Sequence, residues 1–130
     1  MAPTLLPGDY VVAQSRRHSP QRSDILIFEH PHQPGFELVK RVVGLPEEHI
    51  VITRGQVHAN DAVLAEPWAK GPTLPDGDWL LSRDEMFVLG DNRARSAGDS
   101  RVIGPVRLEN ARWKVVGRYW PARSIGRVGL

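Results

Sequence analysis

The chain of 130 residues is long enough to bury one hydrophobic core and short enough to form a single domain. A formal net charge of +2 gives little support for nucleic-acid binding, and the absence of cysteine excludes disulfides and thiol catalysis. No apolar stretch reaches the roughly 20 residues that a membrane-spanning helix requires, and 12 glycines with 11 prolines favour short strands and turns over long helices.

Short apolar runs bounded by turn residues predict a succession of β-strands in the first half of the chain. The first three predicted strands are residues 10–13, 24–28 and 36–43. Two further runs flank Arg54-Gly55 and predict a hairpin with a two-residue turn. These runs are residues 50–53 and 56–59, and Asn60-Asp61 predicts a second tight turn just after them.

The second half of the chain alternates longer polar loops with apolar strands. Residues 70–78 and 90–104 are predicted loops, and residues 86–89 and 113–120 are predicted strands. This order predicts an all-β domain with little helix, in which an antiparallel sheet is coiled into a barrel-like shape. We expect the domain to cover residues 1–121 and residues 122–130 to form a C-terminal tail.

Lys40 has apolar neighbours two positions away on either side within the predicted strand 36–43. Because side chains alternate between the faces of a strand, Leu38, Lys40 and Val42 share one face. If that face is covered, the loss of hydration lowers the pKa of the lysine, and a neutral amine can act as a general base. The alternative is a lysine on a solvated face, with its stem lying over apolar neighbours.

The predicted loop 90–104 concentrates polar and charged residues. It begins with Gly90-Asp91-Asn92-Arg93 and continues through Ser96 to Asp99-Ser100-Arg101. Neighbouring Asp and Arg can pair and brace a loop, and a serine hydroxyl can hydrogen-bond to an amine. Such a loop can orient a nearby lysine. The alternative is an Asx-rich surface turn with a solvated ion pair.

Taken together, these motifs resemble those of bacterial type I signal peptidases, membrane-anchored serine proteases that remove signal peptides from exported proteins. Asn60 with Glu66-Pro67-Trp68, and Tyr119-Trp120-Pro121, are lesser matches to the same family. Four stronger matches occur in the family's order and cover almost the whole chain. They are Met1-Ala2-Pro3-Thr4-Leu5 with Gly8-Asp9, Ser23-Asp24-Ile25-Leu26-Ile27-Phe28, Lys40-Arg41-Val42-Val43-Gly44-Leu45-Pro46, and Gly90-Asp91-Asn92-Arg93 with Asp99-Ser100-Arg101.

The resemblance implies a serine endopeptidase with a Ser/Lys dyad. In this mechanism a serine hydroxyl attacks the peptide carbonyl, and the neutral amine of Lys40 takes its proton. The resemblance also implies that Ser96 positions the lysine amine and that Asp99 and Arg101 brace the loop. The segment from Ser96 to Asp99 is one residue longer than the family's usual Ser-x-Asp.

The same resemblance implies how a substrate binds and where the enzyme works. A signal peptide of an exported preprotein would lie as an extended strand beside Leu38 and Val39, with Met1 and Leu5 lining pockets for small side chains. The expected partners are signal peptides and the membrane surface, without nucleic acid, metal or organic cofactor. The expected location is the cell membrane, with the catalytic domain on the extracytoplasmic side.

The position of the family's nucleophilic serine falls directly before Met1. We therefore expect a truncated sequence, and we expect the printed chain not to hydrolyse peptides. Ser15, Ser19 and Ser23 do not lie in the serine motif of the family.

Two other interpretations stay open at this point. One is a catalytically inactive homologue that acts as a peptide-binding β module. The other is a self-cleaving repressor of the SOS type, which shares Ser-Lys chemistry on a related β-fold but lacks the Gly-Asp-Asn-Arg segment.

Overall fold

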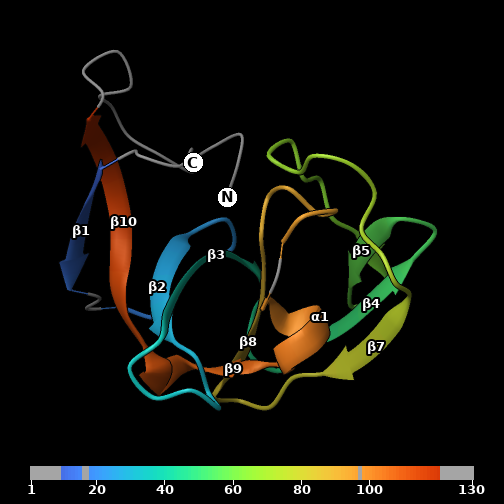
Figure 1. Cartoon of the computed structure of the whole chain (residues 1–130). Helices are drawn as coiled ribbons and strands as arrows, with labels where there is room; N and C mark the ends of the chain where they lie inside the picture. The colour runs from blue at the N-terminus through green and yellow to red at the C-terminus, as the bar shows by residue number, and fades with distance from the viewer. Residues whose placement is uncertain (1–9, 16–17, 97, 121–130) are drawn as a thin grey trace.

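The computed structural model describes residues 10–15, 18–96 and 98–120, which form mostly antiparallel β-structure with little helix (Figure 1). The predicted fold class is therefore confirmed. One short helix, α1 (Ser100–Ile103), and one 3-10 turn, η1 (Leu108–Asn110), interrupt the strands. The strands are β1 (Tyr10–Ser15), β2 (Ile25–Glu29), β3 (Glu37–Gly44), β4 (His49–Thr53), β5 (Gln56–Ala59), β6 (Ala62–Val63), β7 (Gly77–Leu80), β8 (Glu85–Leu89), β9 (Val106–Arg107) and β10 (Ala111–Trp120).

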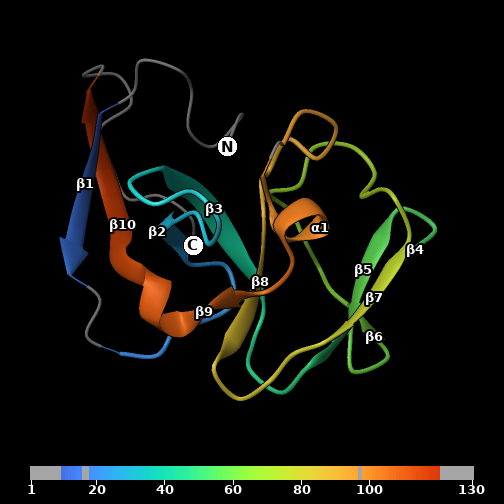
Figure 2. The same cartoon turned by 60° about the horizontal axis from the view of Figure 1, so that its bottom comes forward.

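The strands are arranged in two sheets. Six strands are hydrogen-bonded in the order β1-β10-β2-β3-β8-β9, and four in the order β6-β5-β4-β7. Figures 1 and 2 show the two sheets side by side, with β8 between β3 and the four-stranded sheet. Every pairing between named strands is antiparallel in the described part of the chain.

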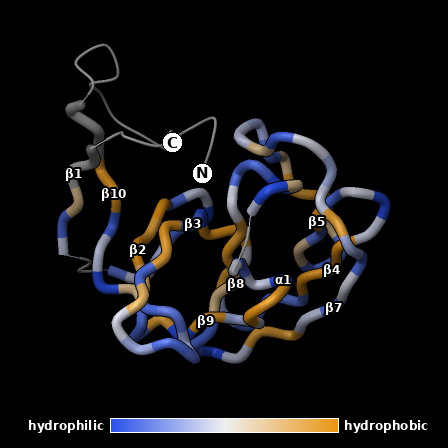
Figure 3. Tube along the Cα trace, in the orientation of Figure 1, coloured by the Kyte–Doolittle hydropathy of each residue, from blue (hydrophilic) through white to orange (hydrophobic). Residues whose placement is uncertain are grey.

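Two apolar clusters lie on opposite faces of β3, because successive side chains of a strand point to opposite faces. Val42 belongs to the cluster that we call the sheet core, and Val43 belongs to the one that we call the linking core. Figure 3 shows the corresponding apolar colouring along β2, β3, β8, β4 and β5. The sheet core is Leu26, Phe28, Val42, Met86, Val88, Val106 and Ala111, and the linking core is Val43, Ile50, Ile52, Val57, Ala59, Leu81, Phe87 and Leu89.

The hairpin around Arg54-Gly55 is confirmed, with β4 and β5 paired from Ile50↔Ala59 to Thr53↔Gln56. Arg54 and Gly55 have φ angles of 53° and 75°, the left-handed conformation that a tight hairpin turn requires at both central positions. Asn60 and Asp61 have φ angles of 49° and 71° and form the second predicted turn, between β5 and β6.

Five short elements were not predicted: β6, β7, β9, α1 and η1. The predicted loop 70–78 overlaps the first two residues of β7, which pairs with β4 and lays Trp79 against the linking core. The predicted loop 90–104 contains α1, capped by the Asp99 side chain, which accepts a hydrogen bond from Arg101 N. Elements of two to four residues are too short for hydrophobic periodicity to identify. Residues 122–130, the predicted tail, lie outside the described residues.

Candidate functional site

Lys40 lies in the middle of β3, where it pairs with Leu26 of β2. Its side chain shares a face with Leu38 and Val42, as the alternation predicts, and Leu38 packs at the margin of the sheet core. Lys40 is only 7% exposed. Its Nζ atom donates a hydrogen bond of 3.0 Å to the Oγ atom of Ser96. The alternative of a solvated lysine is therefore wrong, and the structure brings Lys40 and Ser96 together across 56 residues of sequence.

The surroundings of Lys40 favour its neutral form. Burial lowers the pKa of the amine, because a charged group loses its hydration. The carboxylate of Asp99 opposes this shift and the guanidinium of Arg101 adds to it, and the resulting pKa lies below the usual 10.5. At moderate pH, a larger fraction of such a lysine is neutral than of a solvated lysine, and only the neutral amine can accept a proton.

Gly90, the first residue after β8, allows the site to close around the amine. A Cβ atom at this position would collide with the Oγ and Cβ atoms of Ser96 and would lie 3.5 Å from Lys40 Nζ. The lack of a side chain at residue 90 therefore lets the serine approach the lysine. We call residues 90–101 the site loop; Ala97 within it lies outside the described residues.

Asp99 and Arg101 form a buried ion pair next to Ser96, as the sequence predicts. The Nε and Nη2 atoms of Arg101 donate hydrogen bonds of 3.0 and 2.7 Å to the two carboxylate oxygens of Asp99. Burial alone would raise the pKa of Asp99, but hydrogen bonds and charge from Arg101, with a further hydrogen bond from Ser96, lower it on balance. Asp99 thus remains a carboxylate that can accept the Ser96 hydroxyl proton in a hydrogen bond.

Asp91 and Arg93 are close in sequence, but each pairs with a distant residue. Asp91 accepts two hydrogen bonds, of 2.9 and 2.8 Å, from the guanidinium of Arg41, which also lies 4.9 Å from the centroid of a Trp68 ring. Arg93 pairs with Glu66 at 2.7 Å. The sequence patterns did not identify Arg41 and Glu66 as these partners, although a buried guanidinium group requires acceptors.

The four predicted substrate-binding residues divide into two groups. Met1 and Leu5 lie outside the described residues. Leu38 and Val39 are half-buried on opposite faces of β3: Leu38 packs against the sheet core, and Val39 packs beside Ile25 and Val115. Their predicted contact with an extended peptide stays a prediction.

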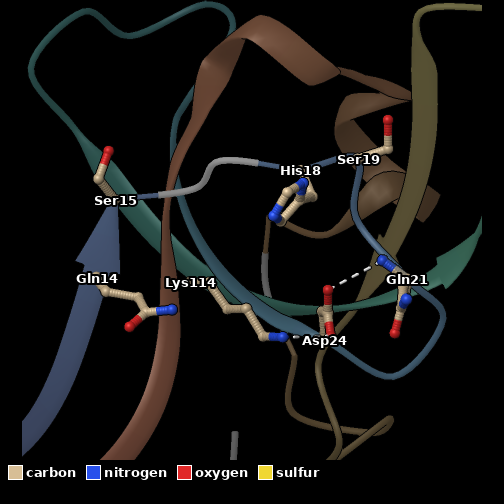
Figure 4. A pocket seen from close by; sticks show the side chains of 7 residues that line it. All are labelled: Gln14, Ser15, His18, Ser19, Gln21, Asp24 and Lys114. Atoms are coloured by element: carbon tan, nitrogen blue, oxygen red, sulfur yellow. Dashed lines mark hydrogen bonds and ion pairs between the residues drawn. The ribbon is translucent and has the colours of Figure 1, made fainter.

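A separate hollow of about 460 Å³ opens beside β1, β10 and the start of β2 (Figure 4). In its wall the Nζ atom of Lys114 lies 3.3 Å from Asp24 Oδ1, and Gln21 N donates a hydrogen bond of 2.9 Å to Asp24 Oδ2. The lining residues are Gln14, Ser15, His18, Ser19, Gln21, Asp24 and Lys114. Neither Lys40 nor Ser96 is among them, so this hollow is distinct from the lysine site.

The described residues contain no group of three or more His, Asp or Glu side chains arranged to hold a metal ion. No helix in the described part of the chain has the length and apolar character needed to cross a lipid bilayer.

Several known proteins resemble this chain in sequence. A sequence profile of the family described as signal peptidase, peptidase S26, matches residues 1–120. Signal peptidase I of Leptolyngbya laminosa is 34% identical over 143 residues, covering 99% of this chain and 68% of that protein. Probable thylakoidal processing peptidase 2 of Arabidopsis thaliana is 32% identical over 136 residues, covering 96% of this chain and 37% of that protein.

A solved structure gives the same result for the fold. The crystal structure of a signal peptidase I from Enterococcus faecalis V583 superposes with a TM-score of 0.63 and 28% sequence identity, covering 72% of this chain and 94% of that chain. The profile match, the relatives and the shared antiparallel architecture together show that this chain belongs to the signal peptidase family, peptidase S26.

Proposed function

We propose that this chain forms the catalytic domain of a serine endopeptidase that cleaves signal peptides from exported preproteins, with Lys40 as its general base. The observation that carries the proposal is the burial of Lys40, a residue that is 7% exposed and whose amine is hydrogen-bonded to Ser96. The names of the relatives, signal peptidase I among them, support this substrate class.

In the proposed reaction, Lys40 moves one proton at each stage. Its neutral amine takes the hydroxyl proton of the nucleophilic serine, which the family pattern places directly before Met1, as the serine oxygen bonds to the peptide carbonyl carbon. The lysine then gives that proton to the leaving amine, and an acyl-serine ester remains. Next, Lys40 takes a proton from water, whose oxygen attacks the ester, and it returns the proton to the departing serine oxygen.

Ser96 and Asp99 are proposed to orient the lysine for these transfers. The Ser96 hydroxyl donates its hydrogen bond to Asp99 and accepts one from the Lys40 amine. The nitrogen lone pair of Lys40 is then directed away from Ser96 and stays available to the nucleophile. Arg101 keeps Asp99 ionised and therefore keeps it an acceptor.

The substrate is proposed to lie as an extended strand beside β3. Leu38 and Val39 contact it there, while Met1 and Leu5 contribute to pockets for small side chains near the cleaved bond. We propose that the domain works at the membrane surface, on the extracytoplasmic side, where signal peptides of exported preproteins emerge.

The deciding experiment uses a serine-extended chain, in which residues added upstream place a serine directly before Met1. It is incubated with a preprotein peptide that spans a signal-peptide cleavage site, and the products are identified by mass spectrometry. We expect cleavage at one bond. Changing the added serine to alanine, or Lys40→Met, is expected to reduce the rate by about 10³-fold or more, and the printed chain is expected to be inactive.

Two results would contradict the proposal. One is undiminished cleavage by the Lys40→Met variant, which would remove the lysine from the mechanism. The other is binding of the peptide by the serine-extended chain without any cleavage, which would instead support a peptide-binding β module.

A further inference from the structure

We infer that Glu66 is a positioning residue for the proposed reaction, because it holds the site loop against Lys40 through the guanidinium of Arg93. This inference rests on the proposed function and adds to it a residue that lies outside the site loop. Glu66 belongs to the segment of residues 64–76 between β6 and β7, which we call the strap. Figures 1 and 2 show the strap and the site loop side by side.

Arg93 is the junction between the strap and the site loop. Its side chain has no exposed surface, and it donates four hydrogen bonds to three residues. Nη1 and Nη2 bind the two carboxylate oxygens of Glu66 at 3.1 and 2.7 Å, and Nη1 also binds Thr73 Oγ1 at 2.7 Å. Nε binds the carbonyl oxygen of Gly90 at 2.8 Å. The planar guanidinium therefore fixes the relative positions of all three acceptors.

Each end of the site loop is tied to Arg93. At one end, Arg93 Nε donates to the carbonyl oxygen of Gly90. Gly90 is the residue that lies against Ser96 and Lys40, with no room for a side chain. The carbonyl oxygen of Arg93 accepts a hydrogen bond of 2.9 Å from Arg101 Nη2, which also binds Asp99. Displacement of Arg93 would therefore move both the backbone beside the amine and the ion pair that supports Ser96.

The strap is itself fixed to both neighbours. Lys70 N donates to Asp91 O at 2.8 Å, and Arg93 N donates to Lys70 O at 3.1 Å. On its other side, Thr73 N donates to Gly55 O at 2.9 Å in the β4–β5 turn. The strap thus connects the hairpin of the four-stranded sheet to the site loop, and Glu66 supplies the negative charge at this connection.

The charge of Glu66 matters because the guanidinium beside it is buried. The side chain of Glu66 is 9% exposed, so little water can replace its carboxylate. A glutamine at this position keeps the shape of the side chain but removes the charge and offers one oxygen in place of two. We expect the Glu66→Gln variant to let Arg93 shift, Ser96 withdraw and water reach Lys40.

The main test measures kcat and KM of the serine-extended chain across pH. For Glu66→Gln we expect kcat to fall by about tenfold with KM changed less than about twofold, because the reacting groups are displaced and the peptide-binding strand is not. We also expect the acid limb of the kcat profile to move to higher pH, since hydration restores the basicity of Lys40. The variant keeps both charged residues that act on this amine, Asp99 and Arg101.

A matched control is available in the Arg22–Glu48 pair. Glu48 accepts two hydrogen bonds from Arg22, at 2.9 and 2.7 Å, and one from Leu45 N, and these partners lie outside the site loop. Glu48→Gln therefore removes the same charge from a similar bidentate pair. We expect it to lower stability and to leave the acid limb unmoved. Thr73→Val removes one hydrogen bond to Arg93. It should move the acid limb in the same direction as Glu66→Gln, but by less.

An NMR titration of the side-chain signals of the three lysines, Lys40, Lys70 and Lys114, provides a readout that needs no catalysis. We expect Glu66→Gln to raise the titration midpoint of Lys40 alone. If neither this midpoint nor the acid limb moves while Glu66→Gln behaves like Glu48→Gln, Glu66 only stabilises the fold and the inference is overturned. If the parent serine-extended chain does not cleave but the midpoint moves, the proposed function fails and the positioning by Glu66 stands.

Discussion

The linking core and the buried part of the site loop are held together by different forces. Ile52 in the linking core is 1% exposed and Arg93 in the site loop is 2% exposed. Ile52 is stabilised by apolar burial, which has no preferred direction and depends mainly on area. Arg93 is stabilised by four hydrogen bonds with fixed geometry.

Because of this difference, substitutions in the two regions are expected to have different effects. A shortened side chain in the linking core leaves a cavity that its neighbours can partly fill. A lost partner in the site loop leaves a buried charge that nothing nearby can satisfy. We therefore expect substitutions in the linking core to act on stability, and substitutions around the site loop to act also on the proposed reaction.

The largest loss of stability is expected for Asp91→Ala, which leaves the buried guanidinium of Arg41 without its carboxylate. Breaking a buried pair in this way costs about 3–5 kcal/mol, and urea unfolding of the printed chain measures it. The control is Asp78→Ala, which breaks the exposed pair with His49 and should cost less than about 1 kcal/mol. Equal losses of unfolding free energy in the two variants would show that burial does not increase the cost of breaking an ion pair in this chain.

Ile52→Ala is expected to lower the free energy of unfolding by about 2–5 kcal/mol, because it opens a cavity in the linking core. In the serine-extended chain, kcat per folded molecule and the acid limb should match those of the parent, since Ile52 is on the four-stranded sheet. A shift of the acid limb in this variant would mean that the linking core also controls Lys40.

Gly90→Ala is expected to cost about 1–3 kcal/mol of stability, because the new methyl group overlaps Ser96. Its effect on the proposed reaction should be larger, with kcat lowered by about 10²-fold as Ser96 is pushed away from the amine. Parallel measurements of urea unfolding and kcat test this. An unchanged kcat would show that the approach of Ser96 to Lys40 is not needed for cleavage.

The smallest effect concerns the pH dependence of stability. Burial lowers the pKa of Lys40 in the folded chain, so between that pKa and the usual 10.5 the unfolded chain binds more protons and stability rises with pH. Lys40→Met removes this rise. As the pH rises through this range, the stability of the parent should therefore increase relative to that of the variant, by about 1.4 kcal/mol per unit of lowering. Urea midpoints of both proteins from neutral to alkaline pH measure it.

The sequence was most informative where a pattern is local. Alternation along residues 36–43 predicted the face of Lys40, and the two-residue turn at Arg54-Gly55 predicted the β4–β5 hairpin. The proximity of Ser96 to Lys40 came from the family resemblance, since 56 residues separate them.

The partners of Asp91 and Arg93 could not be predicted from local patterns. Asp91 binds Arg41 across 50 residues and Arg93 binds Glu66 across 27, and both contacts depend on how strands and loops meet in space. Proximity in sequence indicated only that neighbouring Asp and Arg residues of this loop can pair, as Asp99 and Arg101 do. The sequence did not predict β9 for a different reason. A strand of two residues is defined by its pairing with β8 and not by its own composition.

Lys40 and Arg41 are adjacent basic residues in β3, so the alignment of this strand decides which way each side chain faces. Lys40 faces Ser96, while Arg41, on the opposite face, binds Asp91. A slip of one residue between β3 and its neighbours would exchange these two side chains. The guanidinium, which stays protonated at any physiological pH, would then occupy the place of the amine and could accept no proton. The pairing of β3 with β2 and β8 on both sides therefore selects which of the two neighbouring side chains faces Ser96.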